Sequence, residues 1–174
     1  RISINSRSIS KTDFTRILDG LKAQLDSKKK EFKTLDYFSP YGIFLLIALT
    51  WFKEQNVDFY IIECGRGVRY DDSNSINGKL GVITSMFEEH LDYFGPTEVD
   101  VFRDKIAISD TSEKVIVSKK LQHFMLPSNT SITNNNHLFT IDVPKVYKDS
   151  LNLATEASRE ILSREVKIEK SIFQ

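Results

Sequence analysis

The chain has 174 residues, enough for one domain of ordinary size with a sizeable core. Hydrophobic residues make up 40% of it and charged residues 28%, a balance typical of globular proteins rather than disordered or fibrous ones. Its 24 Lys and Arg residues equal its 24 Asp and Glu residues in number, so the formal net charge is zero. That balance gives no indication of nucleic acid or an anionic membrane as a partner.

The one cysteine, Cys64, excludes an internal disulfide framework and suits a reducing compartment. The longest apolar block, Ile43–Phe52, is too short for a membrane span, which needs about 20 residues. No charged-then-apolar leader opens the chain, so we predict a cytoplasmic protein, and we expect a monomer. The sequence begins at Arg1 rather than Met, and in the middle of a pattern, which predicts a fragment or a processed chain.

The first part of the chain predicts an arm and two helices. Residues 1–10 alternate apolar and polar side chains, as a short strand or extended arm does. Ser10 is a good N-cap residue for a helix. Apolar residues follow it at helical spacing: Phe14, Ile17, Leu18 and Leu21. A second helix is predicted over about Tyr41–Gln55, and its apolar residues go nearly all the way round, so we expect it to be buried against a sheet.

Strands and helices then alternate. Runs of β-branched and apolar residues predict buried strands at Val57–Ile62, Gly81–Thr84 and Lys114–Ser118. Alternation at Leu138–Val143 indicates a strand near a sheet edge, and residues 128–137 form a polar loop. Helices are predicted at Val99–Ser109 and Tyr147–Ser163. This order predicts a single α/β domain over residues 1–174, with a mostly parallel sheet flanked by helices.

Polar side chains follow two of the predicted strands. Glu63 ends the first, Thr84 and Ser85 end the second, and His90 lies in the loop beyond. Ligands of open α/β sheets bind at the carboxyl ends of parallel strands, so a carboxylate and an imidazole there predict a divalent cation site. A lone loop histidine is more often a surface residue than a ligand, and both interpretations stay open.

Other catalytic patterns are incomplete. Gly65 and Gly67 follow a strand, but the third glycine of a dinucleotide fingerprint is missing, and the sequence has no P-loop motif. The histidines lack the spacings of zinc sites. Lys105, from its pattern alone, is an ordinary lysine on a helix face. Composition and periodicity alone therefore predict no more than an α/β domain with an acidic site that is flanked by glycines. We expect these glycines to let the backbone turn sharply rather than to bind phosphate.

The segment Glu63–Asn74, ECGRGVRYDDSN, resembles the E-x-G-x-G-G-R-x-D-x-T-N signature of the folylpolyglutamate synthases, ATP-dependent amide-forming ligases of the Mur ligase superfamily. The matching residues are Glu63, Gly65, Gly67, Arg69, Asp71 and Asn74, with Ser73 for Thr. Val82–His90, VITSMFEEH, is similar to the family's V-I-T-N-I-x-x-D-H. Gly95–Thr97 and Arg103–Ile108 resemble its L-G-x-T and R-E-K-A-G-I blocks, and the flanking segments agree in order.

The resemblance implies a Mur ligase-like central domain and roles for particular residues. Glu63 and His90 match the family's Mg²⁺ ligands, and Lys105 matches a lysine that carries a carbamate at the metal site. Arg69 and Asn74 are implied as cofactor-binding residues. The implied reaction is attack by an amino group on an acyl phosphate made from ATP, with glutamate or another amino acid added to a folate-like or peptide acceptor in one-carbon metabolism.

The chain also departs from the family pattern. The P-loop strand and helix that normally precede this region, and the C-terminal domain, are absent from the sequence, so we expect the isolated chain to be inactive and ATP to bind only together with the missing P-loop segment. Val68 replaces a glycine, Ser85 an asparagine and Glu89 an aspartate. Two alternatives therefore stay open: a diverged, non-catalytic homologue that acts as a binding module, or a Mur-type ligase for a cell-wall or other glutamyl acceptor.

Overall fold

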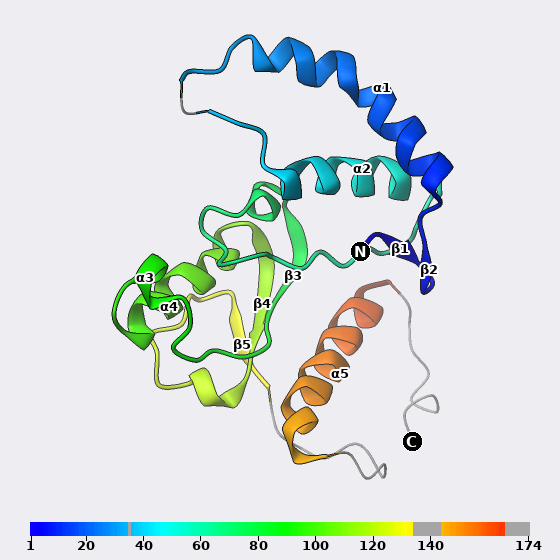
Figure 1. The fold of residues 1–174 in the computed structure, drawn as a ribbon. Coiled ribbons are helices and arrows are strands. Elements are labelled where there is room, and N and C mark those ends of the chain that lie inside the picture. Colours follow the sequence, from blue (N-terminus) through cyan, green and yellow to red (C-terminus); the bar gives the residue numbers. More distant parts are fainter. Residues whose placement is uncertain (35, 134–143, 166–174) are drawn as a thin grey trace. The chain divides into compact units, whose positions relative to one another are not determined.

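The computed structural model describes residues 1–34, 36–133 and 144–165 (Figure 1). The contacts divide the chain into two compact units, Arg1–Gly65 and Arg66–Gln174, here named unit 1 and unit 2. The single domain over residues 1–174 stays a prediction. None of the helices in the described ranges has the length and apolar character of a membrane span.

Unit 1 begins with a small hairpin where the sequence predicts a strand or arm. Strands β1 (Ser3–Ile4) and β2 (Arg7–Ser8) pair antiparallel, with Ser3 opposite Ser8. The turn residues Asn5 and Ser6 both have positive φ, 47° and 65°. Positive φ at both central positions is the signature of the two-residue turns whose twist matches that of the flanking strands.

Both helices predicted for this part of the chain are confirmed. Helix α1 (Lys11–Lys29) begins after Ser10, whose hydroxyl accepts a hydrogen bond from the Asp13 N–H. Helix α2 (Pro40–Glu54) begins after Ser39, with proline at its first position, where the missing N–H costs nothing. The two helices pack around Ile17, Ile47 and Trp51, which are 3%, 0% and 8% exposed. Within unit 1, α2 therefore packs against α1 and the hairpin.

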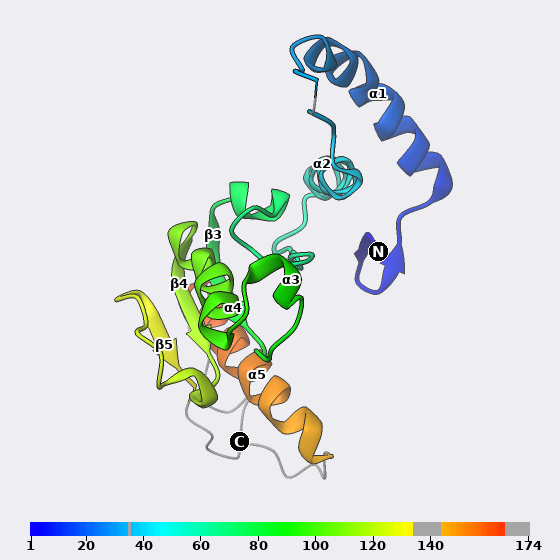
Figure 2. The ribbon, with the colours of Figure 1, turned by 60° about the vertical axis from the view of Figure 1, so that its left-hand side comes forward.

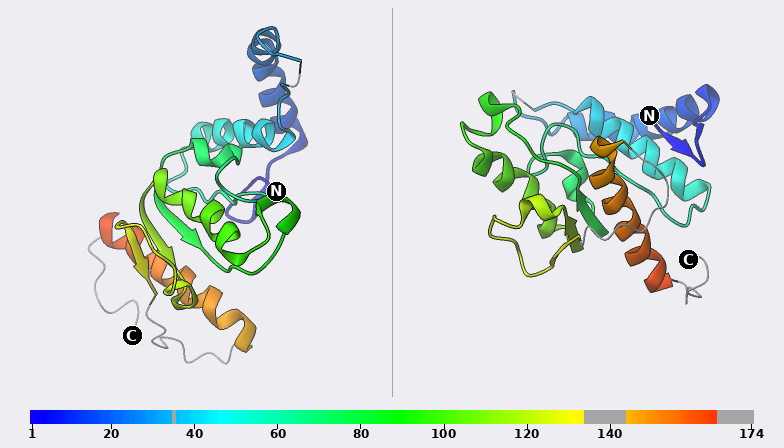
Figure 3. Two further views of the ribbon diagram at one scale, coloured as in Figure 1. Left: turned by 90° about the vertical axis from the view of Figure 1, so that its left-hand side faces the viewer. Right: turned by 90° about the horizontal axis from the view of Figure 1, so that it is seen from below.

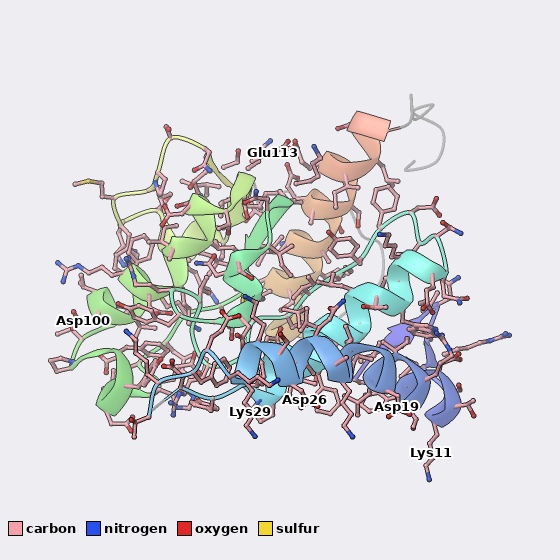
Figure 4. The ribbon with its side chains drawn as sticks, turned by 90° about the horizontal axis from the view of Figure 1, so that it is seen from above. Lys11, Asp19, Asp26, Lys29, Asp100 and Glu113 are labelled. Carbon is pink, nitrogen blue, oxygen red and sulfur yellow. The ribbon has the colours of Figure 1, made fainter. Side chains whose placement is uncertain are left out.

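The outer side of α1 is charged along its length, from Lys11 through Asp19 and Asp26 to Lys29 (Figure 4). An ion network joins the start of α1 to the end of α2. The Arg16 guanidinium lies 2.6 Å from Glu54 Oε2 and 3.3 Å from Asp13 Oδ1. The network ties the two helices together at one end of unit 1.

This network makes the stability of unit 1 depend on pH. The hydrogen bond from Arg16 lowers the pKa of Glu54 below its ordinary 4.5, and hydrogen bonds from Ser10 and then Arg16 lower the pKa of Asp13 below 3.8. A carboxyl group with a lowered folded-state pKa adds stability above its unfolded pKa and loses it as pH falls through the folded value. We expect the thermal midpoint, followed by fluorescence of Trp51, to fall below about pH 4.5, and less steeply in Arg16→Gln. Arg7→Gln, an exposed arginine on β2, should keep the wild-type slope.

The strand predicted at Val57–Ile62 is wrong. The segment forms no strand and pairs with none of the strands in the described residues, and Phe59, Tyr60 and Ile61 are 51%, 49% and 90% exposed. β-branched and aromatic residues favour a strand, yet a strand also needs a neighbour to accept its backbone hydrogen bonds. In the described part of unit 1, the only paired strands are β1 and β2, and this segment pairs with neither of them.

Unit 2 is built on a parallel sheet, which confirms the predicted fold class. Strands β3 (Gly78–Ile83), β4 (Ser112–Val117) and β5 (Thr130–Ile132) lie in the order β3-β4-β5, and both pairings are parallel. β3 and β4 overlap the strands predicted at Gly81–Thr84 and Lys114–Ser118, and each of them ends one residue earlier than predicted. β5 corrects the prediction of a loop over residues 128–137, while the strand predicted at 138–143 lies outside the described residues.

Helices cover both faces of this sheet (Figure 2, Figure 3). Helices α3 (Leu91–Phe94) and α4 (Glu98–Lys105) lie on one side, and the 3₁₀ turn Ile106–Asp110 links α4 to β4. Helix α5 (Lys145–Glu165) lies on the other side, packed on β3 and β4. Two shorter 3₁₀ turns span Asp72–Ser75 and Lys119–Leu121.

A hydrophobic core cluster of unit 2 lies between the sheet and the 3₁₀ turn Ile106–Asp110. Ile83, Val115, Val117 and Leu121 form it, none more than 5% exposed. α4 and α5 confirm the helices predicted near residues 99–109 and 147–163. Helix α5 is held on the sheet by the burial of Leu153. Two ion pairs, Lys114–Glu160 and Lys120–Asp149, hold it further. This sheet and its helices position the predicted site residues of unit 2.

Candidate functional site

The end of β3 opens into a loop that carries several of the predicted site residues. β3 ends at Ile83, and Thr84 and Ser85 follow it as exposed side chains. Because β3 and β4 are parallel, this is the carboxyl edge of the sheet, where open α/β folds bind their ligands. The loop continues to Glu89 and His90 and then enters α3.

His90 lies in an unusual backbone conformation. Its φ and ψ are 50° and 41°, in the left-handed region, which histidine adopts more readily than branched residues do. Its carbonyl accepts hydrogen bonds from the N–H groups of Tyr93 and Phe94, which starts α3. The imidazole is exposed and meets the Phe94 ring edge-on at 6.2 Å between centroids. The ring nitrogens thus lie on a surface loop at the strand end.

Lys105 is not the ordinary helix-face lysine that its pattern indicates. It is the last residue of α4, and its side chain is only 18% exposed. Its ammonium nitrogen lies 2.5 Å from Oε1 of Glu89, whose side chain is 27% exposed. The structure therefore brings Lys105 to the loop that contains His90. Glu89 was not among the predicted site residues, and its position directly before His90 in the matched motif is the signal that points to it.

Glu63 belongs to unit 1, in the extended segment after α2. Its backbone carbonyl accepts a hydrogen bond from the Tyr41 hydroxyl, and its side chain is exposed. The structure places Glu63 relative to Tyr41 and α2. It brings together Glu89, His90 and Lys105 in unit 2, and it does not determine where Glu63 lies relative to them.

Arg69 and Asn74 occupy different places in unit 2. The Arg69 guanidinium donates a hydrogen bond of 3.0 Å to the Arg103 carbonyl in the last turn of α4, where a cation also complements the helix dipole. Asn74 Oδ1 accepts a hydrogen bond of 2.8 Å from the Thr111 hydroxyl, just before β4. Asn74 therefore lies at the amino edge of the sheet, the opposite edge to His90.

A cleft of about 360 Å³ lies beside α4 and includes Arg69. Aromatic and charged side chains line it: Arg69, Tyr70, Tyr93, Phe94, Asp100, Arg103 and Asp104. Asp100 is tied to the start of α4, since its carboxylate accepts hydrogen bonds from the Thr97 hydroxyl and N–H. The Thr97 hydroxyl bond is the main reason that the pKa of Asp100 lies below its ordinary value.

Gly67 shapes the turn under this cleft. Its φ is +92°, and a Cβ atom there would lie 2.6 Å from Asp104 Oδ1 and 2.7 Å from the Phe94 ring. The same Asp104 oxygen accepts a hydrogen bond of 2.6 Å from the Val68 N–H. The predicted role of this glycine, a sharp backbone turn, is confirmed. Asp104, 8% exposed, was not predicted because the pattern of α4 gives no sign of a carboxylate facing inward.

Comparison with known proteins shows which proteins the chain is similar to. No family model matches the chain. It is 33% identical over 97 residues to the dihydrofolate synthase/folylpolyglutamate synthase of Escherichia coli K12, a match that covers 56% of the chain and 22% of that protein. The corresponding protein of Bacillus subtilis 168 is 31% identical over 111 residues, with 62% and 25% covered. Over part of its length, the chain is thus similar in sequence to these folylpolyglutamate synthases.

Solved structures of this family share the fold. The apo form of L. casei FPGS aligns with a TM-score of 0.56 at 16% identity, over 91% of the chain and 32% of that structure. An FPGS–AMPPCP complex aligns with a TM-score of 0.52 at 15% identity, over 84% of the chain and 30% of that structure. The chain spans about a quarter of the length of the E. coli and B. subtilis synthases.

Proposed function

We propose that this chain is the central part of an ATP-dependent ligase of the folylpolyglutamate synthase type. The full protein would activate a carboxylate as an acyl phosphate and join it to the amino group of glutamate or another amino acid. The sequence relationship to dihydrofolate synthase/folylpolyglutamate synthases supports this function most directly. The site motifs that the chain shares with this family, at matching spacing, support it further.

In this proposal, Glu63 and His90 hold Mg²⁺. No group of three His, Cys, Asp or Glu side chains gathers into a ready metal site within the described ranges. Mg²⁺ needs no such cage, because it usually takes one or two carboxylates and leaves its other positions to water and phosphate. The exposed carboxylate of Glu63 fits that donor set, whereas the exposed imidazole of His90 is proposed as a ligand from the motif resemblance. When bound, the metal and ATP would supply charge neutralisation and the phosphoryl group.

The chain's own residues would then position these groups. The carboxyl edge of β3 presents Thr84, Ser85 and His90 on one loop, and Lys105 reaches the same loop from α4. In the proposed active form, Lys105 carries a carbamate, which turns its positive charge into a negative one next to the metal site. Arg69 and Asn74 remain proposed cofactor-binding residues. The position of Arg69 in the lining of the cleft supports this role for Arg69.

The decisive experiment measures ADP release by the full-length protein with ATP, Mg²⁺ and glutamate. A folate-type acceptor, such as dihydropteroate or tetrahydrofolate, should stimulate ADP release, and a cell-wall peptide acceptor should not. The reverse result would assign a Mur-type ligase for another acceptor. If no acceptor stimulates ADP release and calorimetry detects no Mg²⁺-dependent ATP binding, the protein is a binding module and the proposal is wrong.

A further inference from the structure

The cleft beside α4 has aromatic side chains that are open to solvent. Tyr70 and Tyr93, which both line it, are 83% and 46% exposed. The Tyr93 ring already has neighbours, because Phe94 meets it edge-on at 5.0 Å between centroids and the Arg66 guanidinium lies over it at 4.2 Å. The Tyr70 ring is almost entirely open. It therefore offers a flat apolar face, within the cleft, on which another flat ring can stack.

Two arginines of the cleft have hydrogen-bonding capacity that the protein does not use. The Arg69 guanidinium donates to the Arg103 carbonyl at 3.0 Å, which leaves its other N–H donors without a partner in the described residues. The Arg103 side chain is 72% exposed, and its contact with Asp100 is long, at 3.4 Å. So exposed an ion pair is weak, because water and salt screen it. Both guanidinium groups are therefore able to bind an oxyanion.

The two carboxylates of the cleft, in contrast, are held by groups of the protein. Asp100 Oδ2 accepts hydrogen bonds from the Thr97 hydroxyl and N–H, at 2.7 Å and 3.1 Å. Asp104 is 8% exposed, and its Oδ1 accepts the Val68 N–H at 2.6 Å. The carboxylates of the cleft thus already have donors, whereas its guanidinium groups have donors to spare. This difference favours a negatively charged ligand over a cation.

We propose that this cleft binds a small ligand that joins a flat aromatic ring to an oxyanion, either a carboxylate or a phosphate. The ring stacks on Tyr70, and the oxyanion accepts paired hydrogen bonds from Arg69 or Arg103, because the planar guanidinium fork matches such groups. The cleft volume of about 360 Å³ lies at the lower end of the range for small-molecule pockets. This binding site goes beyond the proposed ligase function and requires neither ATP nor Mg²⁺.

The test is a titration of the full-length protein with small probes, followed by ligand-observed NMR, without ATP or Mg²⁺. Benzoate and phenyl phosphate carry both a ring and an oxyanion, and the stronger binder of the two identifies the oxyanion. Benzamide has the ring without the charge, and cyclohexanecarboxylate has the charge without an aromatic ring. We expect each of these two to bind at least about fivefold more weakly than the stronger binder, since each lacks one of the recognised features.

Variants locate the binding in the cleft. Arg103→Gln and Tyr70→Leu should each weaken binding of the stronger probe at least about threefold. Both side chains are exposed, so the fold should remain intact. The matched control for the arginine is Lys79→Gln, which removes a 73% exposed cation of unit 2 from another surface ion pair. The matched control for the tyrosine is Tyr147→Leu, a 61% exposed residue on α5. Neither control should change the affinity.

The outcomes separate this site from the ligase proposal. The proposal is wrong if neither benzoate nor phenyl phosphate binds, or if benzamide or cyclohexanecarboxylate binds as tightly as they do. Binding that the two cleft variants leave unchanged, or that the control variants weaken equally, would also overturn it. ADP release tests the ligase function by itself. A protein that binds the probes in the cleft but releases no ADP with any acceptor would keep this site and reject the ligase.

Discussion

Replacing Glu63 with alanine in the full-length protein is expected to lower Mg²⁺-dependent ADP release by at least about 100-fold, because a lost metal ligand removes charge stabilisation from the transition state. The side chain is exposed, so the fold should remain intact. His90→Ala should have an effect of similar size. The measurement is initial ADP release at saturating ATP over a range of Mg²⁺ concentrations, together with circular dichroism.

Glu31→Ala is the matched control for this experiment. Glu31 is also an exposed glutamate of unit 1, with 64% of its side chain accessible, and it forms an ion pair with Lys28 on the surface. Its removal should leave ADP release unchanged. Excess Mg²⁺ should recover part of the Glu63→Ala activity if the ligand role is correct. Full turnover in Glu63→Ala at limiting Mg²⁺ would refute that role.

Gly67→Ala is expected to lower the free energy of unfolding of unit 2 by about 2–4 kcal/mol. At φ +92° an alanine is strained, and its Cβ would overlap both Asp104 Oδ1 at 2.6 Å and the Phe94 ring at 2.7 Å. Asp104 cannot easily withdraw, because it accepts the Val68 N–H and is buried. Native-state hydrogen exchange of the β3 and β4 amides measures the loss.

Gly20→Ala makes the same substitution where the structure allows it. Gly20 lies within α1, and an added Cβ would meet nothing within 4 Å. Alanine is favoured over glycine in a helix interior by up to about 1 kcal/mol, so this variant should stabilise unit 1. Equal effects of the two substitutions, in size and sign, would show that the close approach at Gly67 does not exist.

Local patterns predicted the parts of the fold that depend on local interactions. Ser10 marked the start of α1, and the buried run of β4 was recognised from residues such as Val115 and Val117. The parts that failed depend on distant partners. Val57–Ile62 has the composition of a strand but no neighbour within its unit to pair with. Thr130–Ile132 has a polar composition, but β4 pairs with it and makes it a strand.

The candidate site shows the same division. Motif spacing pointed to His90 and Lys105, and the structure brings Lys105 to the His90 loop through Glu89. The sequence could not show which carboxylate contacts Lys105 or which one accepts the Val68 N–H. Asp104 facing Val68, and Glu89 facing Lys105, are contacts across 36 and 16 residues respectively. Such contacts depend on how α4 is oriented on the sheet, and no local pattern contains that orientation.

The left-handed backbone at His90 has a consequence for how this protein tolerates change. A histidine in that conformation costs roughly 1 kcal/mol, which glycine would not incur. Selection for thermal stability alone would therefore favour replacing His90 with glycine sooner than replacing a residue whose backbone conformation is relaxed. If histidine is retained at this position under such selection, the imidazole serves a purpose other than stability, one that depends on a side chain at the start of α3.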